Sequence, residues 1–226
     1  EISACLVGSE MCIRDRDKSL GDLMDWLDKN GEADNTIVIF MSDNGGIPNL
    51  PGGSSCAPLR GHKGREWDGG LRVPAVLCRK GRFAEGVRSE QLAAFVDMAP
   101  TIAALVGAGE PPRPYDGVNL LPALTGETAS FPRDLYLGCG AAVSGDCKLI
   151  LKGGSRAMQL KSDYLVYYPE DAYEAQNRIE EHAAEAERLR RYIIRYDTIR
   201  PAHPELPYGQ GKEGFKAPAE WRVTKP

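Results

Sequence analysis

The apolar positions in the first quarter of the chain predict a helix followed by a strand. Four of them recur at i, i+3, i+4 and i+7, the spacing of one face of an amphipathic helix: Leu20, Leu23, Met24 and Leu27. An Asn-Gly pair at residues 30–31 is expected to end this helix. Residues 36–41 form an unbroken β-branched and apolar run, which is typical of a strand buried on both faces of a parallel sheet. The run stops at S-D-N-G-G, residues 42–46, at the strand end where open α/β sheets collect their chemistry.

The middle of the chain predicts one long loop, two strands and a second helix. Residues 47–70 are rich in Gly, Pro and Ser, and loops of this length in compact domains are usually functional or disordered. Residues 73–78 predict a second strand and residues 92–96 a third. Residues 97–106 predict a helix that an Asp caps at its start and that Gly107 closes.

The C-terminal part has a different pattern, in which short apolar runs alternate with Gly and Ser. Residues 135–137, 148–151 and 164–168 predict the strands of a small antiparallel sheet. Residues 173–196 predict a long helix with acidic residues early and arginines late, as the helix dipole favours. Its apolar face is formed by five residues: Ile179, Ala183, Ala186, Leu189 and Ile193.

Residues 1–16 have no clear apolar period and join abruptly to the helical pattern that begins at Asp17. This break favours the hypothesis that the segment is a leader not native to the protein. The hypothesis predicts that genomic DNA does not read through this stretch without interruption.

Composition and charge narrow the class of protein. Hydrophobic residues make up 42% of the 226 residues and charged residues 27%, which is typical of globular proteins. The net charge of −4 argues against general nucleic-acid binding, which needs a clustered excess of Lys and Arg. No apolar run approaches the ~20 residues that span a bilayer.

Six cysteines form no C-x-x-C pair and have no histidines at zinc spacing, so a structural zinc site is not expected. Cys139 and Cys147 flank a short Gly-rich segment. They either form a bridge across a hairpin or remain two free or buried thiols, and both alternatives stay open.

Two short motifs carry residues that suit an anionic ligand and a cation. Asp43 and Asn44 offer the hard oxygen ligands that Ca²⁺ and Mg²⁺ prefer, although Asp-Asn-Gly is also a common turn. Lys63 lies between two glycines, where the backbone can approach a ligand and the ammonium can meet an oxyanion. The alternative for Lys63 is a solvated lysine in a flexible loop.

The order of these motifs resembles the type I, arylsulfatase-like sulfatase family. The resemblance covers most of the chain from Asp17 to about Arg195. The blocks that carry it follow one another along the chain: S-D-N-G-G at 42–46, P-L-R-G-x-K-G at 58–64, D-G-G-L-R-V-P at 68–74, D-x-x-P-T at 97–101, D-G-x-x-L-x-P at 116–122 and G-D-x-K-L-I at 145–150. Several ordered blocks are much more specific than any one of them.

The resemblance implies roles for four residues. In such enzymes the Asp and Asn of the D-N-G loop bind a divalent cation, usually Ca²⁺ with Mg²⁺ as the alternative, and here these are Asp43 and Asn44. The lysine of the G-x-K-G block, Lys63, contacts the substrate sulfate. His62 stands where the family more often has a small residue, and we expect it to neighbour the substrate. The family's nucleophile is a formylglycine, which attacks sulfur in its hydrated form before the alcohol leaves.

The string C-A-P-L-R at residues 56–60 matches the family's nucleophile motif C-x-P-x-R. We reject Cys56 as the nucleophile because the family places that motif far before the D-N-G loop, whereas Cys56 follows Asn44. The nucleophile, the paired aspartates of the metal site and a catalytic histidine are therefore expected upstream of this sequence. The chain alone is expected to be inactive.

The resemblance implies an α/β, alkaline-phosphatase-like fold. Residues 17–127 are expected to form the C-terminal part of the catalytic domain, with a partial mixed or parallel sheet flanked by helices. Residues 128–200 are expected to form a small antiparallel-sheet-plus-helix subdomain, followed by a surface-wrapping tail at 201–226. A partial sheet would expose edges and apolar surface, which favours aggregation.

The function implied is that of a sulfuric ester hydrolase acting on a sulfate-ester small molecule or a sulfated glycan. One alternative is a phosphodiesterase or phosphoglycerol transferase of the same superfamily. The other is a relative that binds sulfated glycans without cleaving them. The family is largely periplasmic, secreted or lysosomal, and the resemblance is the only guide to the compartment.

Overall fold

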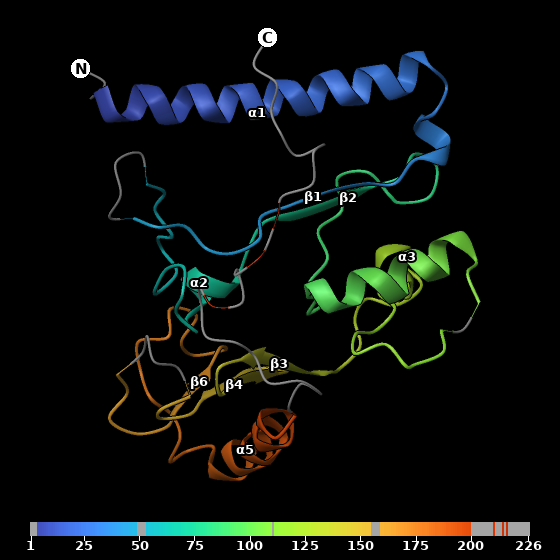
Figure 1. Cartoon of the computed structure of the whole chain (residues 1–226). Coiled ribbons are helices and arrows are strands. Elements are labelled where there is room, and N and C mark those ends of the chain that lie inside the picture. Colours follow the sequence, from blue (N-terminus) through green and yellow to red (C-terminus); the bar gives the residue numbers. More distant parts are fainter. Residues whose placement is uncertain are drawn as a thin grey trace.

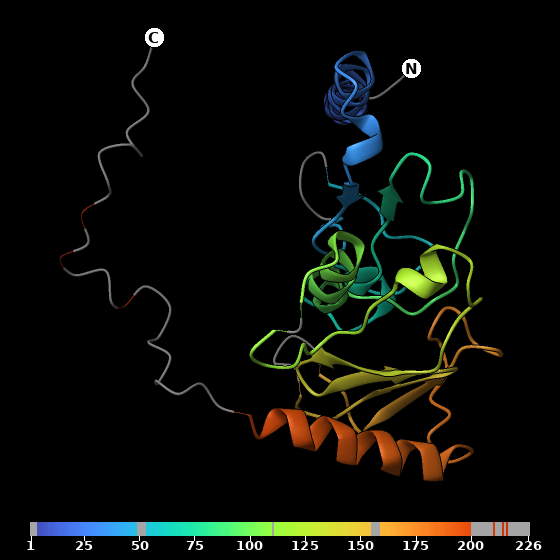
Figure 2. The ribbon, with the colours of Figure 1, turned by 90° about the vertical axis from the view of Figure 1, so that its right-hand side faces the viewer.

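The computed structural model describes residues 4–48, 53–109, 111–154 and 159–199, together with residues 210, 214 and 216 (Figure 1). Two antiparallel sheets lie in layers, with one long helix beyond each of them (Figure 2). The helices are α1 (Ala4–Lys29), α2 (Asp68–Leu71), α3 (Met98–Val106), α4 (Leu121–Leu124) and α5 (Ala183–Asp197). The strands are β1 (Val38–Met41), β2 (Ala75–Cys78), β3 (Asp134–Gly138), β4 (Ala141–Ser144), β5 (Cys147–Ile150) and β6 (Tyr164–Tyr167).

The helix predicted over the first apolar repeat is confirmed, but it is longer than expected. α1 ends at Lys29, just before Gly31, and it begins at Ala4 instead of near Asp17. On its apolar face Leu27 is buried, whereas Leu23 is 47% exposed. No helix in the described part of the chain is both long enough and apolar enough to cross a membrane. Whether residues 1–16 are native stays a prediction.

The first sheet differs from the predicted parallel one. β1 pairs only with β2 within the described ranges, and the pair is antiparallel, with Val38 opposite Cys78 and Met41 opposite Ala75. The prediction of a strand buried on both faces is wrong here, since Phe40 remains 42% exposed. An unbroken apolar run identifies a strand but does not specify its neighbours.

The strand predicted at residues 92–96 is also wrong, because the segment turns into a 3-10 helix at Phe95–Asp97. The cause is the carboxylate of Asp97, which accepts a hydrogen bond from the amide of Ala94 at 2.7 Å and bends the chain. The helix predicted after it, α3, is confirmed, and Gly107 closes it with φ 67° and ψ 30°.

Asp97 also joins two of the recognised blocks. Its second carboxylate oxygen accepts a hydrogen bond from the amide of Val118 at 2.9 Å. Arg133 pairs at 2.5 Å with the first oxygen, the one that accepts from Ala94. A Cβ on Gly117 would lie 2.0 Å from the carbonyl oxygen of Val96. The D-x-x-P-T and D-G-x-x-L-x-P blocks are therefore packed against each other, which requires both the aspartate and the glycine.

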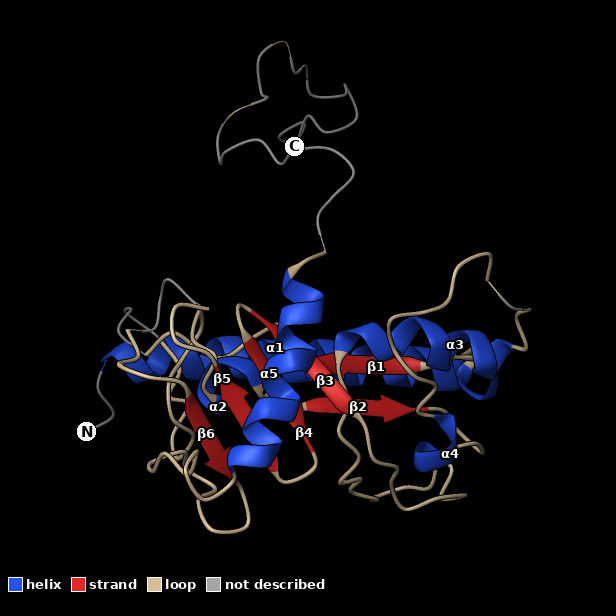
Figure 3. Cartoon of the chain, turned by 90° about the horizontal axis from the view of Figure 1, so that it is seen from below, coloured by secondary structure: helices blue, strands red, loops and turns tan. Residues whose placement is uncertain are grey.

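The predicted antiparallel sheet of the C-terminal part is confirmed as a four-stranded sheet of order β3-β4-β5-β6, including a strand, β4, that the sequence analysis missed. α5 crosses one face of this sheet (Figure 3). Their contact buries the main core of the chain: Ala142, Cys147, Leu149, Leu165, Ala186, Leu189 and Ile193. Cys139 and Cys147 are free cysteines, so the bridge between them is not formed.

α5 begins ten residues later than the sequence predicted. The carboxylate of Asp171 accepts a hydrogen bond from the amide of Gln176 at 2.7 Å, which folds the preceding residues into turns. Glu174 lies there with φ 59°, a conformation incompatible with a continuous helix. Ile179 therefore precedes α5, although it still packs against the core.

Candidate sulfate and cation site

The S-D-N-G-G loop that follows β1 lies against the segment that carries Lys63. The amide of Lys63 donates a hydrogen bond to the carbonyl of Gly46 at 3.0 Å. The amide of Gly45 donates to the carbonyl of Gly70 in the D-G-G-L-R block, also at 3.0 Å. Three blocks that are separate in the sequence therefore meet at one place.

Glycines make this close approach possible. A Cβ on Gly45 would lie 1.8 Å from the carbonyl oxygen of Gly69, and one on Gly70 would lie 2.2 Å from the carbonyl oxygen of Arg65. A Cβ on Gly69 would lie 2.5 Å from the carbonyl oxygen of Gly61. These neighbours are backbone atoms and cannot turn aside, so any larger residue would force the loops apart.

Asp43 and Asn44 lie together at the start of this junction. The side-chain amide of Asn44 donates to the carboxylate of Asp43 at 2.5 Å, and the hydroxyl of Ser42 donates to the carbonyl of Asn44 at 3.0 Å. A carboxylate beside a carboxamide oxygen suits a hard cation such as Ca²⁺ or Mg²⁺. The described residues contain no cluster of three or more His, Cys, Asp or Glu side chains that could hold a metal ion. Ca²⁺ takes about six to eight oxygen ligands, so two side chains fit part of its coordination shell.

Lys63 presents an exposed ammonium beside the loop. It lies in a segment with two left-handed glycines, Gly61 and Gly64, each with φ 80°. No acidic side chain among the described residues pairs with the Lys63 ammonium. The ring Nδ1 of His62, which is half-buried, lies 3.0 Å from the carbonyl oxygen of Lys63. The lysine is thus held by its backbone while its charge stays available to an anion.

Cys56 also lies at this junction. Its thiol is half-buried and lies 3.7 Å from the carbonyl oxygen of Gly46. It is a free cysteine. This position brings Cys56 close to the D-N-G loop in space, and the prediction that it is not the nucleophile remains a prediction.

A cavity of 330 Å³ opens next to His62. It lies between the segment around Lys63 and the stretch between β5 and β6. Among the residues that the structure describes, its lining contains basic, aromatic and polar side chains but no Asp or Glu: Arg60, Gly61, His62, Arg65, Trp67, Gln159 and Leu160. The cavity therefore favours an anionic or strongly polar ligand.

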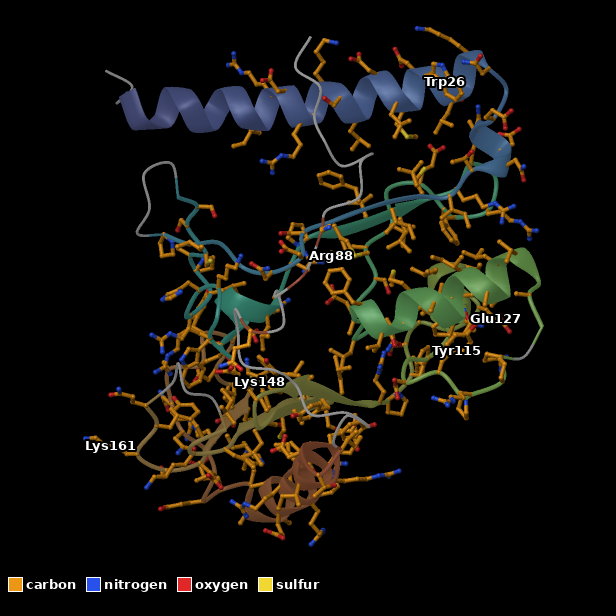
Figure 4. The ribbon with its side chains drawn as sticks, viewed as in Figure 1. Trp26, Arg88, Tyr115, Glu127, Lys148 and Lys161 are labelled. Carbon is orange, nitrogen blue, oxygen red and sulfur yellow. The ribbon has the colours of Figure 1, made fainter. Side chains whose placement is uncertain are left out.

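A buried ion cluster beneath α2 was missed by the sequence analysis. Lys148, only 1% exposed, pairs with Asp68 at 2.6 Å, contacts the carboxylate of Glu174 and donates to the carbonyl of Glu66 at 3.1 Å. The amide of Asp68 donates to Glu174 at 2.7 Å, and the hydroxyl of Tyr168 donates to Asp68 at 2.9 Å. Figure 4 marks Lys148 on the sheet side of α2.

Burial raises the pKa of the Glu174 carboxyl, and burial beside Asp68 raises the pKa of the Tyr168 hydroxyl. The cluster is structural, because it fixes the D-G-G-L-R block to the C-terminal sheet. A lysine inside the otherwise apolar run Cys147–Ile150 was the signal that could have revealed it.

The sequence of the chain is similar to those of sulfatases. Residues 11–108 match the sulfatase family model. Human arylsulfatase A is 40% identical over 118 residues, which cover 52% of this chain and 23% of that protein. Rat steryl-sulfatase is 34% identical over 140 residues, which cover 58% of this chain and 24% of that protein. The match thus spans about a quarter of the length of these relatives.

The fold of the chain is also similar to that of solved sulfatase structures. The PsFucS1 sulfatase from Pseudoalteromonas sp. superimposes with a TM-score of 0.65 at 23% identity, over 77% of this chain and 40% of that chain. Ps i-CgsB in complex with k-i-k-neocarrahexaose superimposes with a TM-score of 0.67 at 26% identity, over 80% of this chain and 41% of that chain. Residues 11–108 are therefore similar to the sulfatase family, and the chain shares part of the alkaline-phosphatase-like α/β fold of these sulfatase structures.

Proposed function

We propose that this chain carries the sulfate-binding and cation-binding part of a sulfuric ester hydrolase of the arylsulfatase type. The observation that carries the proposal is the hydrogen bond from the amide of Lys63 to the carbonyl of Gly46, which joins the lysine segment to the D-N-G loop. The sequence similarity to arylsulfatase A and steryl-sulfatase supports it.

Asp43 and Asn44 would hold a divalent cation, Ca²⁺ or Mg²⁺, through their side-chain oxygens. Such an ion supplies stabilisation of negative charge on the sulfate oxygens when it is bound. Lys63 binds the same sulfate from its own side as a point charge. Because the ester oxygen gains negative charge as the S–O bond breaks, the unpaired ammonium stabilises the transition state more than the ground state. His62 lies next to Lys63 and would contact the group that leaves.

The nucleophile of this reaction is a formylglycine that the present residues do not provide. Cys56 is expected to keep its thiol, and a mass spectrum of the peptide that contains it should show unmodified cysteine. An aldehyde at Cys56 would instead make it the nucleophile. We therefore expect the chain alone to bind sulfate without hydrolysing 4-nitrophenyl sulfate.

The substrate we propose is a sulfated carbohydrate or another small sulfate ester. Ps i-CgsB has been solved with k-i-k-neocarrahexaose, and BT4656 with its substrate D-glucosamine-2-N,6-O-disulfate. Both proteins superimpose on this chain with TM-scores above 0.5. A saccharide ligand is in keeping with the polar lining of the cavity beside His62.

Calorimetric titration of the purified chain tests this proposal. Ca²⁺ is expected to bind, and inorganic sulfate is expected to bind more tightly in the presence of Ca²⁺. Lys63→Ala should weaken sulfate binding about tenfold or more, because hydrogen bonds to charged groups contribute roughly 1.5–3 kcal/mol. Lys29→Ala is the matched control, since Lys29 is exposed on α1.

The proposal fails if Lys63→Ala and the control bind sulfate equally well. Preference for inorganic phosphate over sulfate would favour the phosphodiesterase alternative. Hydrolysis of an aryl sulfate by the chain alone would contradict the assignment of the nucleophile.

A further inference from the structure

We propose that the cavity beside His62 is a second anion subsite, which selects substrates that carry another negatively charged group besides the reacting sulfate. The inference rests on the proposed function and deepens it, because it names the substrate class as a polyanionic carbohydrate. The residues that carry it are Arg60 and Arg65, and Gln159 also lines the cavity.

The first observation is that charges are segregated within the segment of residues 60–68. Its two acidic residues, Glu66 and Asp68, are only 7% and 3% exposed, and Asp68 is neutralised by Lys148. The basic side chains Arg60 and Arg65 line the cavity instead. A segment of mixed charge thus presents an almost purely positive face, and a cavity of one sign concentrates ligands of the other.

Arg60 is held in place before any ligand arrives. Its guanidinium lies 3.7 Å from the ring centroid of Trp67, and one of its nitrogens donates to the hydroxyl of Tyr164 at 3.3 Å and to the carbonyl of Glu174. A guanidinium has five N–H donors, so others remain for a ligand. A fixed arginine loses little conformational entropy on binding, which favours affinity for a carboxylate or sulfate.

Arg65 is the second cationic side chain of the cavity, and its guanidinium is available to a ligand. Its side chain makes no hydrogen bond or ion pair with any residue in the described ranges. Its backbone is fixed, since its amide donates to the carbonyl of His62 at 3.0 Å. A half-buried arginine at the wall of a cavity loses part of its hydration, and no described residue compensates for this loss at the Arg65 guanidinium. An anionic ligand would supply the missing hydrogen bonds.

The geometry links the cavity to the sulfate site. His62 lines the cavity, and Lys63 is the next residue along the chain. Two of the lining residues, Gln159 and Leu160, come from the C-terminal part, so the subsite forms only where the two parts of the chain meet. A volume of 330 Å³ is at the low end of small-molecule sites, which suits one sugar unit with its substituent.

The test compares two saccharides by calorimetric titration of the full chain in Ca²⁺. The probes are N-acetylglucosamine-6-O-sulfate, with one anionic group, and D-glucosamine-2-N,6-O-disulfate, with two. We expect the disulfate to bind about tenfold more tightly, in line with the 1.5–3 kcal/mol of a charge-assisted hydrogen bond. Arg65→Gln should remove this difference and leave the affinity for the monosulfate unchanged. Arg82→Gln, at an exposed arginine after β2, is the matched control and should keep the difference.

Each outcome separates the subsite from the proposed function. If the wild-type chain binds both probes equally, the subsite is overturned and the proposed function stands. If Arg65→Gln weakens both probes alike, or Arg82→Gln removes the difference, the preference comes from general charge and the subsite is again overturned. If neither probe binds and Lys63→Ala changes nothing, the proposed function itself fails.

Discussion

Two lysines of the chain show how neighbours decide the role of one residue type. Lys63 is exposed and has no acidic partner among the described residues, so its charge is available to a ligand. Lys148 is 1% exposed and touches the carboxylates of Asp68 and Glu174. A charge buried in this way stabilises the fold only while its partners are present.

Lys148→Met is therefore expected to lower the free energy of unfolding by about 3–5 kcal/mol, because it leaves two buried carboxylates without their cation. Urea denaturation followed by circular dichroism measures the change. Lys29→Met, on the exposed surface of α1, should change the free energy of unfolding by less than about 0.5 kcal/mol. A similar small loss for Lys148→Met would show that the cluster does not hold the molecule together.

A second residue-level prediction concerns acid. The hydrogen bonds from Arg188 hold the pKa of Asp134 below its usual value. The folded state then binds fewer protons than the unfolded state at low pH, so this pair stabilises the fold above about pH 4 and loses its effect as the pH falls through the lowered pKa. Asp134→Asn should remove about 1 kcal/mol or less at neutral pH, since Arg188 is partly exposed.

The measurement for this pair is the urea midpoint as a function of pH. The wild-type midpoint should fall more steeply than that of Asp134→Asn as the pH decreases below about 4, so that the two curves converge in acid. Parallel curves would mean that the ion pair contributes nothing to the acid sensitivity of the fold.

At the scale of elements, the site depends on loops that interlock through glycines. Gly70→Ala would place a methyl group 2.2 Å from the carbonyl oxygen of Arg65 and 2.6 Å from that of His62. We expect the variant to separate the D-N-G loop from the lysine segment, so that affinities for Ca²⁺ and sulfate fall together by about tenfold or more.

Calorimetric titration of both ions measures this effect, and Gly21→Ala is the control. Gly21 has no atom within 4 Å of its Cβ position and lies inside α1, so alanine there should raise helix stability slightly and leave both affinities unchanged. If Gly70→Ala lowered only one of the two affinities, the two loops would not act as one unit.

Most of the helices and strands could be predicted from the sequence, whereas the segments that they pair or pack with could not. Local patterns identified the strand at residues 36–41, the helix closed by Gly107 and the small antiparallel sheet, because each leaves a periodicity in its own residues. The antiparallel partner of β1 and the late start of α5 depend on contacts with distant or turn-forming residues. Asp171 and Asp97 each redirect the chain with one side-chain hydrogen bond, which periodicity does not detect.

The residues of the candidate site were also predicted only in part. The motif order indicated Asp43, Asn44 and Lys63, and the structure brings the loops that carry them together. The cluster around Lys148 and the wall formed by Gln159 were missed, because their partners lie far away in the sequence. The sequence gives the positions of the glycines, but it does not show which backbone atoms they approach in the fold.

At the scale of the whole molecule, burial is unevenly distributed between the two sheets. Leu149, Ile150, Leu165 and Val166 in β5 and β6 are completely buried. In the β1–β2 pair, Phe40 and Val76 are 42% and 60% exposed, and Trp26 on α1 is 56% exposed. Local stability follows buried apolar contacts, so the two parts are expected to open independently.

Hydrogen exchange measured by mass spectrometry tests this division. Amides of β5, β6 and α5 are expected to exchange at least about tenfold more slowly than those of β1 and β2, because, of the two sheets in the described ranges, only the C-terminal one has a fully buried core. Lys148→Met should accelerate exchange in α2 and the D-G-G-L-R block more than in β3, since the lysine joins that block to the sheet. Uniform protection across both sheets would instead mean that the chain unfolds as one cooperative unit. In that case the exposed apolar residues of the first sheet would not mark a separate, weaker part of the molecule.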